Sequence, residues 1–234
     1  MKVLLRIILY LIFFSLCLYE VFLVIPIVII FSIELRKQRN NVKKLIRKLK
    51  GIDLFEGEGL MFKNNAIELS IYGEYGVGES TLWVYNNTKA KILAVDTSSE
   101  WINAVKLKAN SKDRIEIEWV DLGDLGAWGM PLSYKKRDYI YNYVNSVWSR
   151  KEKPQLVLID GRFRVACFLT SLLNGAPGTK LIFDDYINRP KYHIVEEYIK
   201  PYEIFGRQAL FIIPDKIDVE SIQKAINQFI HVMD

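Results

Sequence analysis

A short loop that contains an acid and two glycines is the stretch best suited to chemistry. Glu74, Gly76 and Gly78 follow the apolar run 67–72, and a helix is expected to begin at Ser80. Glycine lets the backbone pass close to a ligand, and the N–H groups at the start of a helix attract negative charge. The spacing therefore predicts that these four residues bind a nucleotide-type cofactor.

Acidic residues also follow the later apolar runs of the chain. They are Asp96, Asp121, Asp160 and the adjacent pair Asp184 and Asp185. The carboxyl ends of parallel strands meet at one edge of a sheet, where ligands bind, so we expect these side chains to lie close together. Asp96 comes 18 residues after Gly78, which suits a carboxylate that accepts hydrogen bonds from a ribose. Asp121 is expected to contact the same cofactor.

NAD and S-adenosylmethionine both present a ribose to such a carboxylate. A dinucleotide loop needs a glycine at position 81, where this chain has Thr81. Glu74, two residues before the first glycine, suits a cofactor with a cationic amino-acid tail. No Gly-Lys-Ser/Thr follows the loop, which excludes a P-loop. The residues therefore favour S-adenosylmethionine, with NAD as the alternative.

Alternating strands and helices from residue 51 onward must position these side chains. The expected strands are 66–72, 91–95, 115–119, 155–159, 180–183, 202–205 and 208–213. The expected helices are 80–85, 100–108, 137–148, 165–173, 192–199 and 219–232. This alternation predicts an α/β, Rossmann-like domain over 51–234 with a mainly parallel seven-stranded sheet. The tight connection at Gly206 and Arg207 predicts that the last strand runs antiparallel.

The first 34 residues are expected to form a single transmembrane anchor. Residues 7–33 are apolar apart from Glu20, which is long enough for one tilted helix. The stretch is too long, and has the wrong flanks, for a cleaved signal peptide. The alternative is a re-entrant hairpin that bends near Glu20 and Pro26.

Residues 35–50 carry eight Lys or Arg residues among apolar positions. They predict a basic juxtamembrane helix that lies on membrane lipid, with the following domain on the cytoplasmic side. The first 50 residues hold ten of the 32 Lys and Arg residues and two of the 27 acids, so the rest carries a net charge of −3. A domain with this balance is not expected to bind nucleic acid.

From Ala66 to Pro214 the chain resembles class I S-adenosylmethionine-dependent methyltransferases. The likeness is carried by the Glu-x-Gly-x-Gly loop, the acid after the second strand and the antiparallel last strand. Within that class, Leu158-Ile159-Asp160-Gly161 and Phe183-Asp184-Asp185-Tyr186 resemble the metal-dependent O-methyltransferases. A narrower likeness, to the glucuronoxylan O-methyltransferases of polysaccharide biosynthesis, rests on Asp160-Gly161-Arg162 and on Gly206-Arg207 with Ile213-Pro214.

The resemblance implies in-line transfer of a methyl group from a sulfonium to a hydroxyl oxygen. It also implies that Asp160, Asp184 and Asp185 hold a divalent cation such as Mg²⁺, which would activate the acceptor hydroxyl. Three carboxylates this close repel each other unless they are protonated or bridged by a cation. Asp160 acting as a metal-free base is the alternative. Two cysteines are too few for a zinc site built from cysteines alone, and two histidines are too few for a His-rich metal site.

Three other side chains have two interpretations each. Arg162 and Arg164 could clamp a uronate or a phosphate, or form ordinary surface ion pairs. His193 could be a general base, or could simply be hydrogen-bonded near the start of a helix. The aromatic residues between 128 and 148 could stack on a sugar or belong to the core.

The function expected from these residues is that of a membrane-anchored O-methyltransferase. Its acceptor would be a hydroxyl of a glycan or lipid-linked glycan, and a divalent metal would assist. One alternative is a membrane-anchored binding or scaffold protein without catalysis, and another is an NAD-linked sugar-modifying enzyme. The intact loop and the acids at the strand ends favour the enzyme, and Thr81 disfavours NAD.

Overall fold

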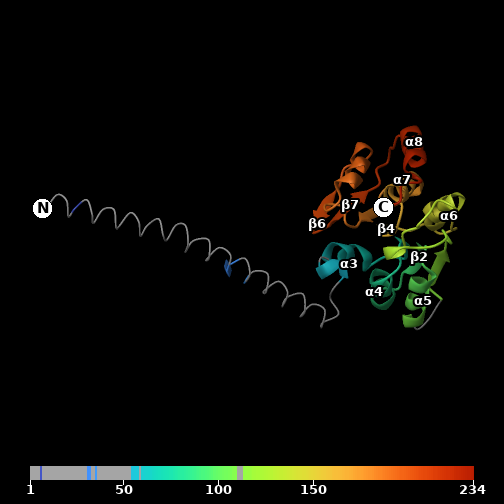
Figure 1. Cartoon of the computed structure of the whole chain (residues 1–234), viewed down its shortest axis with the longest axis horizontal. Helices are drawn as coiled ribbons and strands as arrows, with labels where there is room; N and C mark the ends of the chain where they lie inside the picture. Colours follow the sequence, from blue (N-terminus) through green and yellow to red (C-terminus); the bar gives the residue numbers. More distant parts are fainter. Residues whose placement is uncertain (1–5, 7–30, 33–34, 36–53, 58, 110–112) are drawn as a thin grey trace. The chain divides into compact units, whose positions relative to one another are not determined.

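The structure is a computed structural model that describes residues 6, 31, 32, 35, 54–57, 59–109 and 113–234 (Figure 1). The chain divides into two compact units, Met1–Gly57 and Glu58–Asp234. The first unit includes the short 3-10 helix η2 (Leu54–Gly57). The expected anchor over 1–34 and basic helix over 35–50 lie almost entirely outside the described residues. Within the part that is described, no helix has the length and apolar character needed to cross a membrane.

The second unit is built on a seven-stranded sheet with the order β3-β2-β1-β4-β5-β7-β6. The strands are β1 (Ile71–Tyr75), β2 (Lys91–Asp96), β3 (Ile115–Trp119), β4 (Leu156–Ile159), β5 (Lys180–Phe183), β6 (Glu203–Phe205) and β7 (Gln208–Ile212). β1 to β5 pair in parallel, and β7 runs antiparallel to both β5 and β6. The Rossmann-like sheet and its antiparallel last strand, predicted from the sequence, are confirmed.

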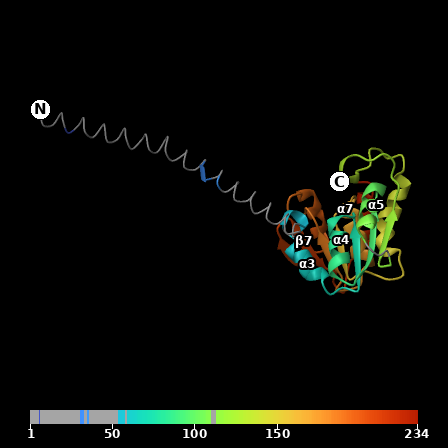
Figure 2. The ribbon, with the colours of Figure 1, turned by 90° about the horizontal axis from the view of Figure 1, so that it is seen from below.

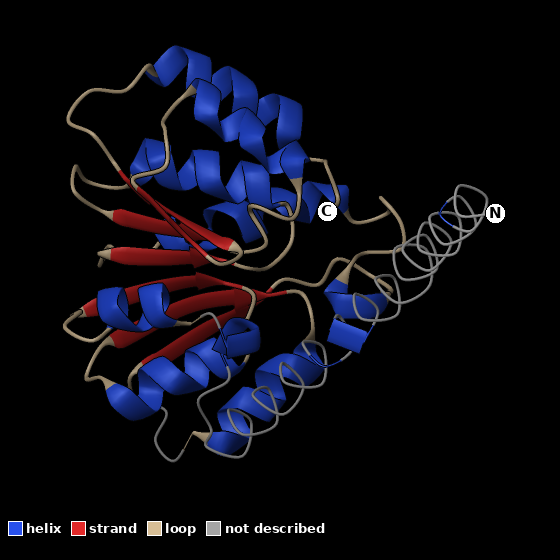
Figure 3. Cartoon of the chain, turned by 90° about the vertical axis from the view of Figure 1, so that its left-hand side faces the viewer, coloured by secondary structure: helices blue, strands red, loops and turns tan. Residues whose placement is uncertain are grey.

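Helices cover both faces of this sheet (Figure 3). They are α3 (Leu60–Ala66), α4 (Glu79–Asn87), α5 (Ser99–Lys108), α6 (Ile140–Asn145), α7 (Arg164–Asn174) and α8 (Val219–Phe229), with 3-10 helices η3 (Ala127–Gly129), η4 (Arg137–Tyr139), η5 (Ser146–Trp148) and η6 (Pro190–Glu197). α4 lies beside α5, as Figure 2 shows, and α7 packs against α6 and α8. The order of the strands reverses between β1 and β4, and ligands bind in the crevice at such a switch point.

α7 supplies the centre of the apolar core. Its residues from Arg164 to Leu172 are all buried. The Phe168 ring stacks on Phe183 of β5 and meets Phe211 of β7 edge-on at 4.7 Å between ring centres. The core therefore fixes α7 against β5 and β7.

The first strand and two helical stretches differ from the sequence prediction. Ala66 ends α3 instead of opening a strand, and β1 begins at Ile71. The short helix buries Met61, Phe62 and Ala66, so the apolar residues near its end belong to a helix face. The expected helix over 137–148 consists of η4, α6 and η5, and the one over 192–199 is the 3-10 helix η6.

Candidate active site

The two glycines of the loop after β1 have different surroundings. Gly76 has φ +87, and a Cβ on it would lie 2.8 Å from the Cα of Gly161. It is therefore a structural glycine that lets the ends of β1 and β4 meet. A Cβ on Gly78 would have no heavy atom within 4 Å, apart from its chain neighbours. Gly78 is the glycine beside which a ligand has room.

Glu74 lies inside β1, not after it, and is fully buried. Its carboxylate accepts hydrogen bonds from the hydroxyls of Ser80 and Thr81, the latter at 2.5 Å. Burial raises the pKa of Glu74 to about 7, and these two hydrogen bonds oppose the shift. Glu74 therefore stabilises the loop through hydrogen bonds from Ser80 and Thr81. We predicted that it would receive the cationic tail of a cofactor, but a buried carboxylate is not placed to do so.

Thr81 is a functional residue whose role the sequence did not reveal. Besides donating to Glu74, its Oγ1 accepts the N–H of Gly78 at 2.9 Å. Thr81, which stands where a dinucleotide loop has its third glycine, thus connects the loop to the start of α4 through hydrogen bonds. Ser80 is also turned toward Glu74 and is only 8% exposed, so its side chain supports the loop from within.

Asp96, the last residue of β2, lies beside the same loop. Its Oδ2 accepts the N–H of Val77 at 2.8 Å, and its Oδ1 accepts the N–H of Ser98 at 2.7 Å. Burial raises its pKa, while these backbone hydrogen bonds oppose the rise. Each carboxylate oxygen has a second lone pair, so Asp96 can still accept hydrogen bonds from a ribose.

A cavity of about 380 Å³ opens next to Asp96. It is lined by residues 97–101, Trp119, Asp121, 123–126, Trp128 and Gly129. Asp121 accepts the N–H of Gly123 at 2.9 Å and forms an ion pair with Lys136, whose hydrogen bond lowers the pKa of Asp121. The predicted cofactor residue Asp121 therefore lies at a cavity of suitable size, already oriented by two partners.

The loop between β3 and η4 folds back over the end of β2. Thr97 Oγ1 donates to the carbonyl of Gly129 at 2.8 Å, and a Cβ on Gly129 would come equally close to that hydroxyl. The aromatic residues of this region separate into two groups. Tyr143 and Trp148 are buried in the core, whereas Trp128 is 80% exposed at the cavity.

Asp160, Asp184 and Asp185 converge at the carboxyl ends of β4 and β5, as predicted. One oxygen from each lies within 4.8 Å of the others, an arrangement that could hold a metal ion. Asp184 is fully buried, while the side chains of Asp185 and Asp160 are 16% and 31% exposed. Burial and the charge of Asp184 raise the pKa of Asp160. Asp160 is thus the most accessible acid of the three.

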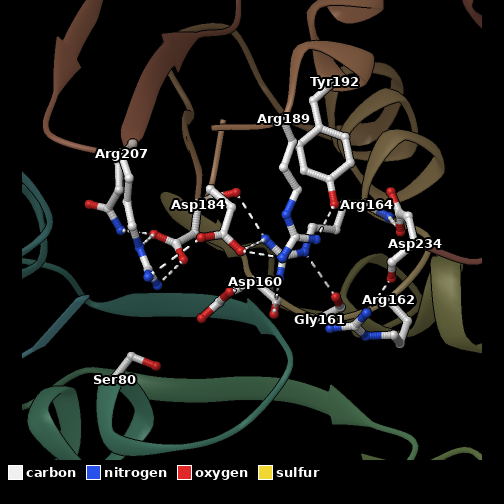
Figure 4. A network of polar contacts seen from close by, with 12 residues as sticks. Ser80, Asp160, Gly161, Arg162, Arg164, Asp184, Arg189, Tyr192, Arg207 and Asp234 are labelled. Carbon is white, nitrogen blue, oxygen red and sulfur yellow. Dashed lines mark hydrogen bonds and ion pairs between the residues drawn. The ribbon is translucent and has the colours of Figure 1, made fainter. Parts of the chain in front are cut away.

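Three arginines balance these three acids (Figure 4). Arg207 bonds both carboxylate oxygens of Asp184, with its Nε 3.0 Å from Oδ1. Arg189 lies 2.9 Å from Asp185, and Arg164 lies within 3.2 Å of both Asp160 and Asp185. The mutual repulsion for which a bridging cation was expected is therefore already relieved by guanidinium groups.

Arg164 is buried, being 2% exposed, and its guanidinium is surrounded by five oxygens of the protein. Its acceptors are the carbonyls of Gly161, Asp160 and Asp184 and the carboxylates of Asp160 and Asp185. It therefore cannot clamp a substrate anion, contrary to our prediction for this residue. The charge of a divalent ion would add to those of three arginines, which already match the three carboxylates. The residues present do not fit a resident divalent cation.

Arg162 and His193 lie at the edge of this cluster. Arg162 Nη1 donates to the carbonyl of Asp234, while its Nε has no hydrogen-bond partner among the described residues. His193 pairs its Nε2 with the carbonyl of Tyr186 at 3.1 Å, and its ring lies on the Tyr186 ring. The unpaired Nε of Arg162 is buried, so it is not exposed to a ligand as the residue stands. His193 makes a local hydrogen bond, which is the simpler of its two interpretations.

Comparison with solved structures finds a similar protein that covers most of this unit. It is a methyltransferase-like protein from Silicibacter pomeroyi DSS-3, 32% identical, with a TM-score of 0.65. The match covers 74% of this chain and 93% of that chain. No protein-family model matches the sequence, and no curated protein matches it.

Two more distant similarities are to methyltransferases of other bacteria. The N-methyltransferase NodS from Bradyrhizobium japonicum WM9, in complex with S-adenosyl-L-homocysteine, is 14% identical over 69% of this chain and 89% of its own, with a TM-score of 0.47. A methyltransferase from Geobacter sulfurreducens is 11% identical over 74% of this chain and 88% of its own, with a TM-score of 0.45. Similarities at this level carry no argument about function. The Silicibacter protein is different, because its 32% identity extends over nearly its whole length. This chain therefore belongs to the same family of methyltransferase-like proteins and has the fold of the class I S-adenosylmethionine-dependent methyltransferases.

Proposed function

We propose that this protein is an S-adenosylmethionine-dependent O-methyltransferase that acts on a hydroxyl of a glycan or lipid-linked glycan. The observation that carries the proposal is the free space beside Gly78, in a loop that Glu74, Thr81 and Asp96 hold in place. The loop lies at the carboxyl end of β1, next to the point where the strand order reverses. A cofactor bound there would lie between Asp96 and the acidic cluster.

The binding roles follow from the groups that border this space. Asp96 would accept hydrogen bonds from the ribose hydroxyls of the cofactor. The cavity lined by Asp121 and Trp119 would hold its adenine ring, which an aromatic face and a carboxylate suit. The cofactor supplies an activated methyl group, so the protein has mainly to position the acceptor and remove its proton.

Asp160 is our candidate for the proton acceptor in this reaction. It follows β4, its backbone N–H donates to the carbonyl of Tyr75 at 3.1 Å, and its side chain is the most exposed of the three acids. These features put a carboxylate with a raised pKa beside the cofactor loop. Arg162, which follows Asp160 by two residues and is only partly buried, is the candidate that binds a uronate or phosphate on the acceptor.

The membrane assignment rests on the amino-acid sequence. Residues 7–33 are apolar and are followed by eight basic residues, so we propose a single-pass anchor with the enzyme on the cytoplasmic side. An acceptor attached to a lipid would be presented to an enzyme held in this way. External protease that digests the domain in sealed cells would contradict the orientation.

The experiment is calorimetric titration of the full chain, in mild detergent, with S-adenosylmethionine and separately with NAD. We expect saturable binding of S-adenosylmethionine to one site and none of NAD. Release of S-adenosylhomocysteine on addition of membrane glycolipids would then establish transfer. Binding of NAD alone would favour the sugar-modifying alternative, and binding of neither would favour a non-catalytic protein.

A further inference from the structure

We propose that the Arg164 guanidinium occupies the place of a divalent cation among the acids, and that the cluster is a metal-free site in which Arg164 positions Asp160. This inference contradicts the metal site expected from the sequence. The absence of a bound metal does not depend on the proposed methyl transfer. The role of Asp160 as proton acceptor rests on that proposed function.

The surroundings of Arg164 are those of a bound cation. Five oxygens surround its guanidinium at 2.9–3.2 Å, two from Asp160 and one each from Gly161, Asp184 and Asp185. Carboxylate and carbonyl oxygens are also the ligands that Mg²⁺ and Ca²⁺ prefer, although at 2.0–2.6 Å. The longer distances and the planar set of five donors fit a guanidinium.

The arginines and hydrogen bonds around the acids leave no role for a second cation. Asp184, the acid in the middle, has both oxygens bonded to Arg207 and receives a further hydrogen bond from Gln208 at 2.8 Å. Figure 4 shows Arg207 and Arg164 on opposite sides of Asp184. Arginine keeps its proton in proteins, so the positive charge of this arrangement is permanent. A divalent ion would have to displace a buried guanidinium to reach these acids.

The backbone around the cluster is shaped for this arrangement. Phe163, which precedes Arg164, is 1% exposed and has φ 54, and Asp185 has φ 57. A positive φ is unfavourable for phenylalanine and persists only when the surrounding structure imposes it, whereas aspartate adopts it more readily. Arg164 is also held through its own N–H, which donates to Asp234 at 3.0 Å, and by the ring of Tyr192 at 5.9 Å. A strained residue thus directly precedes Arg164, next to the contacts that direct it inward.

Arg164 acts on the reaction through Asp160, which makes it a positioning residue. Its Nη2 contacts both the carbonyl and the Oδ1 of Asp160, so one guanidinium fixes the backbone and the side chain of the same residue. A metal ion in this place would bind the acceptor oxygen directly. The guanidinium is buried among protein oxygens and instead leaves the acceptor oxygen to Asp160.

The test is a Mn²⁺ titration of the full-length wild-type protein, followed by electron paramagnetic resonance of the free ion, without cofactor or acceptor. We expect no stoichiometric binding and no change of Tm on addition of Mg²⁺ or EDTA. One tightly bound Mn²⁺ per chain, or a loss of Tm in EDTA, would overturn the proposal. Neither reading depends on methyl transfer, so failure of the proposed function is seen separately, in the titration with S-adenosylmethionine.

The sharper test is Arg164→Met, with Arg189→Met as the matched control. Both variants lose one guanidinium from the cluster, but Arg189 is at its rim with a 38% exposed side chain. We expect Arg164→Met to bind Mn²⁺ at least about tenfold more tightly than Arg189→Met, because only it removes the charge among the acids. Equal Mn²⁺ affinities of the two variants would contradict the central place given to Arg164. Should Arg164→Met not fold, the wild-type titration alone decides.

Discussion

The two sides of the crevice differ in how much space they leave for a ligand. On the side of β1, β2 and β3, a Cβ on Gly78 would meet nothing, and a cavity of about 380 Å³ adjoins the end of β2. On the side of β4, β5 and β7, Asp184 and Arg164 are buried with every charged group paired. The difference indicates that the first side is shaped to bind a ligand, whereas the second is completed by the chain itself.

The protein should therefore lose the most stability when a charged partner is removed on the side of β4, β5 and β7. Arg207→Met would leave Asp184 buried without its main counter-ion, and we expect a loss of about 3–5 kcal/mol in the free energy of unfolding. Chemical denaturation measures it. Arg189→Met, at the exposed rim, should cost less than about 1 kcal/mol. Equal losses in the two variants would remove the distinction between buried and rim charges.

On the side of β1, β2 and β3, the buried acid Glu74 should make the stability of the protein depend on pH. Its pKa rises from 4.5 to about 7 on folding because it is buried, so the folded state favours the protonated form. Its contribution to stability is fully present below about pH 4.5 and is lost as the pH rises through 7, by up to about 3 kcal/mol. Glu74→Gln should lack this loss. Parallel stability profiles of the two proteins between pH 5 and 8 would contradict the assignment.

Gly76→Ala tests whether the first glycine of the loop is structural. The new methyl group would lie 2.8 Å from the Gly161 backbone, at a φ that alanine rarely adopts. We expect a loss of at least about 2 kcal/mol in thermal or chemical unfolding. Unchanged stability would mean that β1 and β4 can separate at this point without cost.

Asp121→Asn should have the smallest effect on stability of the four changes. Asp121 is 44% exposed, and its ion pair with Lys136 lies at the surface. The free energy of unfolding should change little, while the affinity for S-adenosylmethionine falls several-fold because the residue lines the cavity. Lys136→Met removes the same ion pair and serves as the control. If both variants bind the cofactor as the wild type does, the cavity is not its adenine site.

The sequence predicts the convergence of acids because strand ends are recognisable from local patterns. Asp160 and the pair Asp184 and Asp185 each follow a short apolar run that is flanked by polar residues, and parallel strands bring such ends together. The expected strands after the first agree with the structure to within one residue at each end. The first is displaced because apolar residues before β1 form a helix face.

The partners of these acids could not be predicted in the same way. Arg207 meets Asp184 because β7 pairs with β5 in the register Phe183 opposite Ala209. Both strands are buried on both faces, so no alternation of apolar and polar residues specifies this register in the sequence. The burial of Arg164 depends on the left-handed backbone of Phe163, a residue that rarely adopts it. One signal was present for the loop, since Thr81 stands where a dinucleotide site has glycine, and its hydroxyl proves to bind Glu74.

The most direct test of a cofactor site at the loop is the affinity of Gly78→Ala for S-adenosylmethionine. Its new methyl group would meet no protein atom within 4 Å, so the free energy of unfolding should stay within about 1 kcal/mol of the wild type. The same methyl group would enter the space assigned to the cofactor, and calorimetry should show binding at least about tenfold weaker. Wild-type affinity in a stably folded Gly78→Ala protein would contradict the assignment.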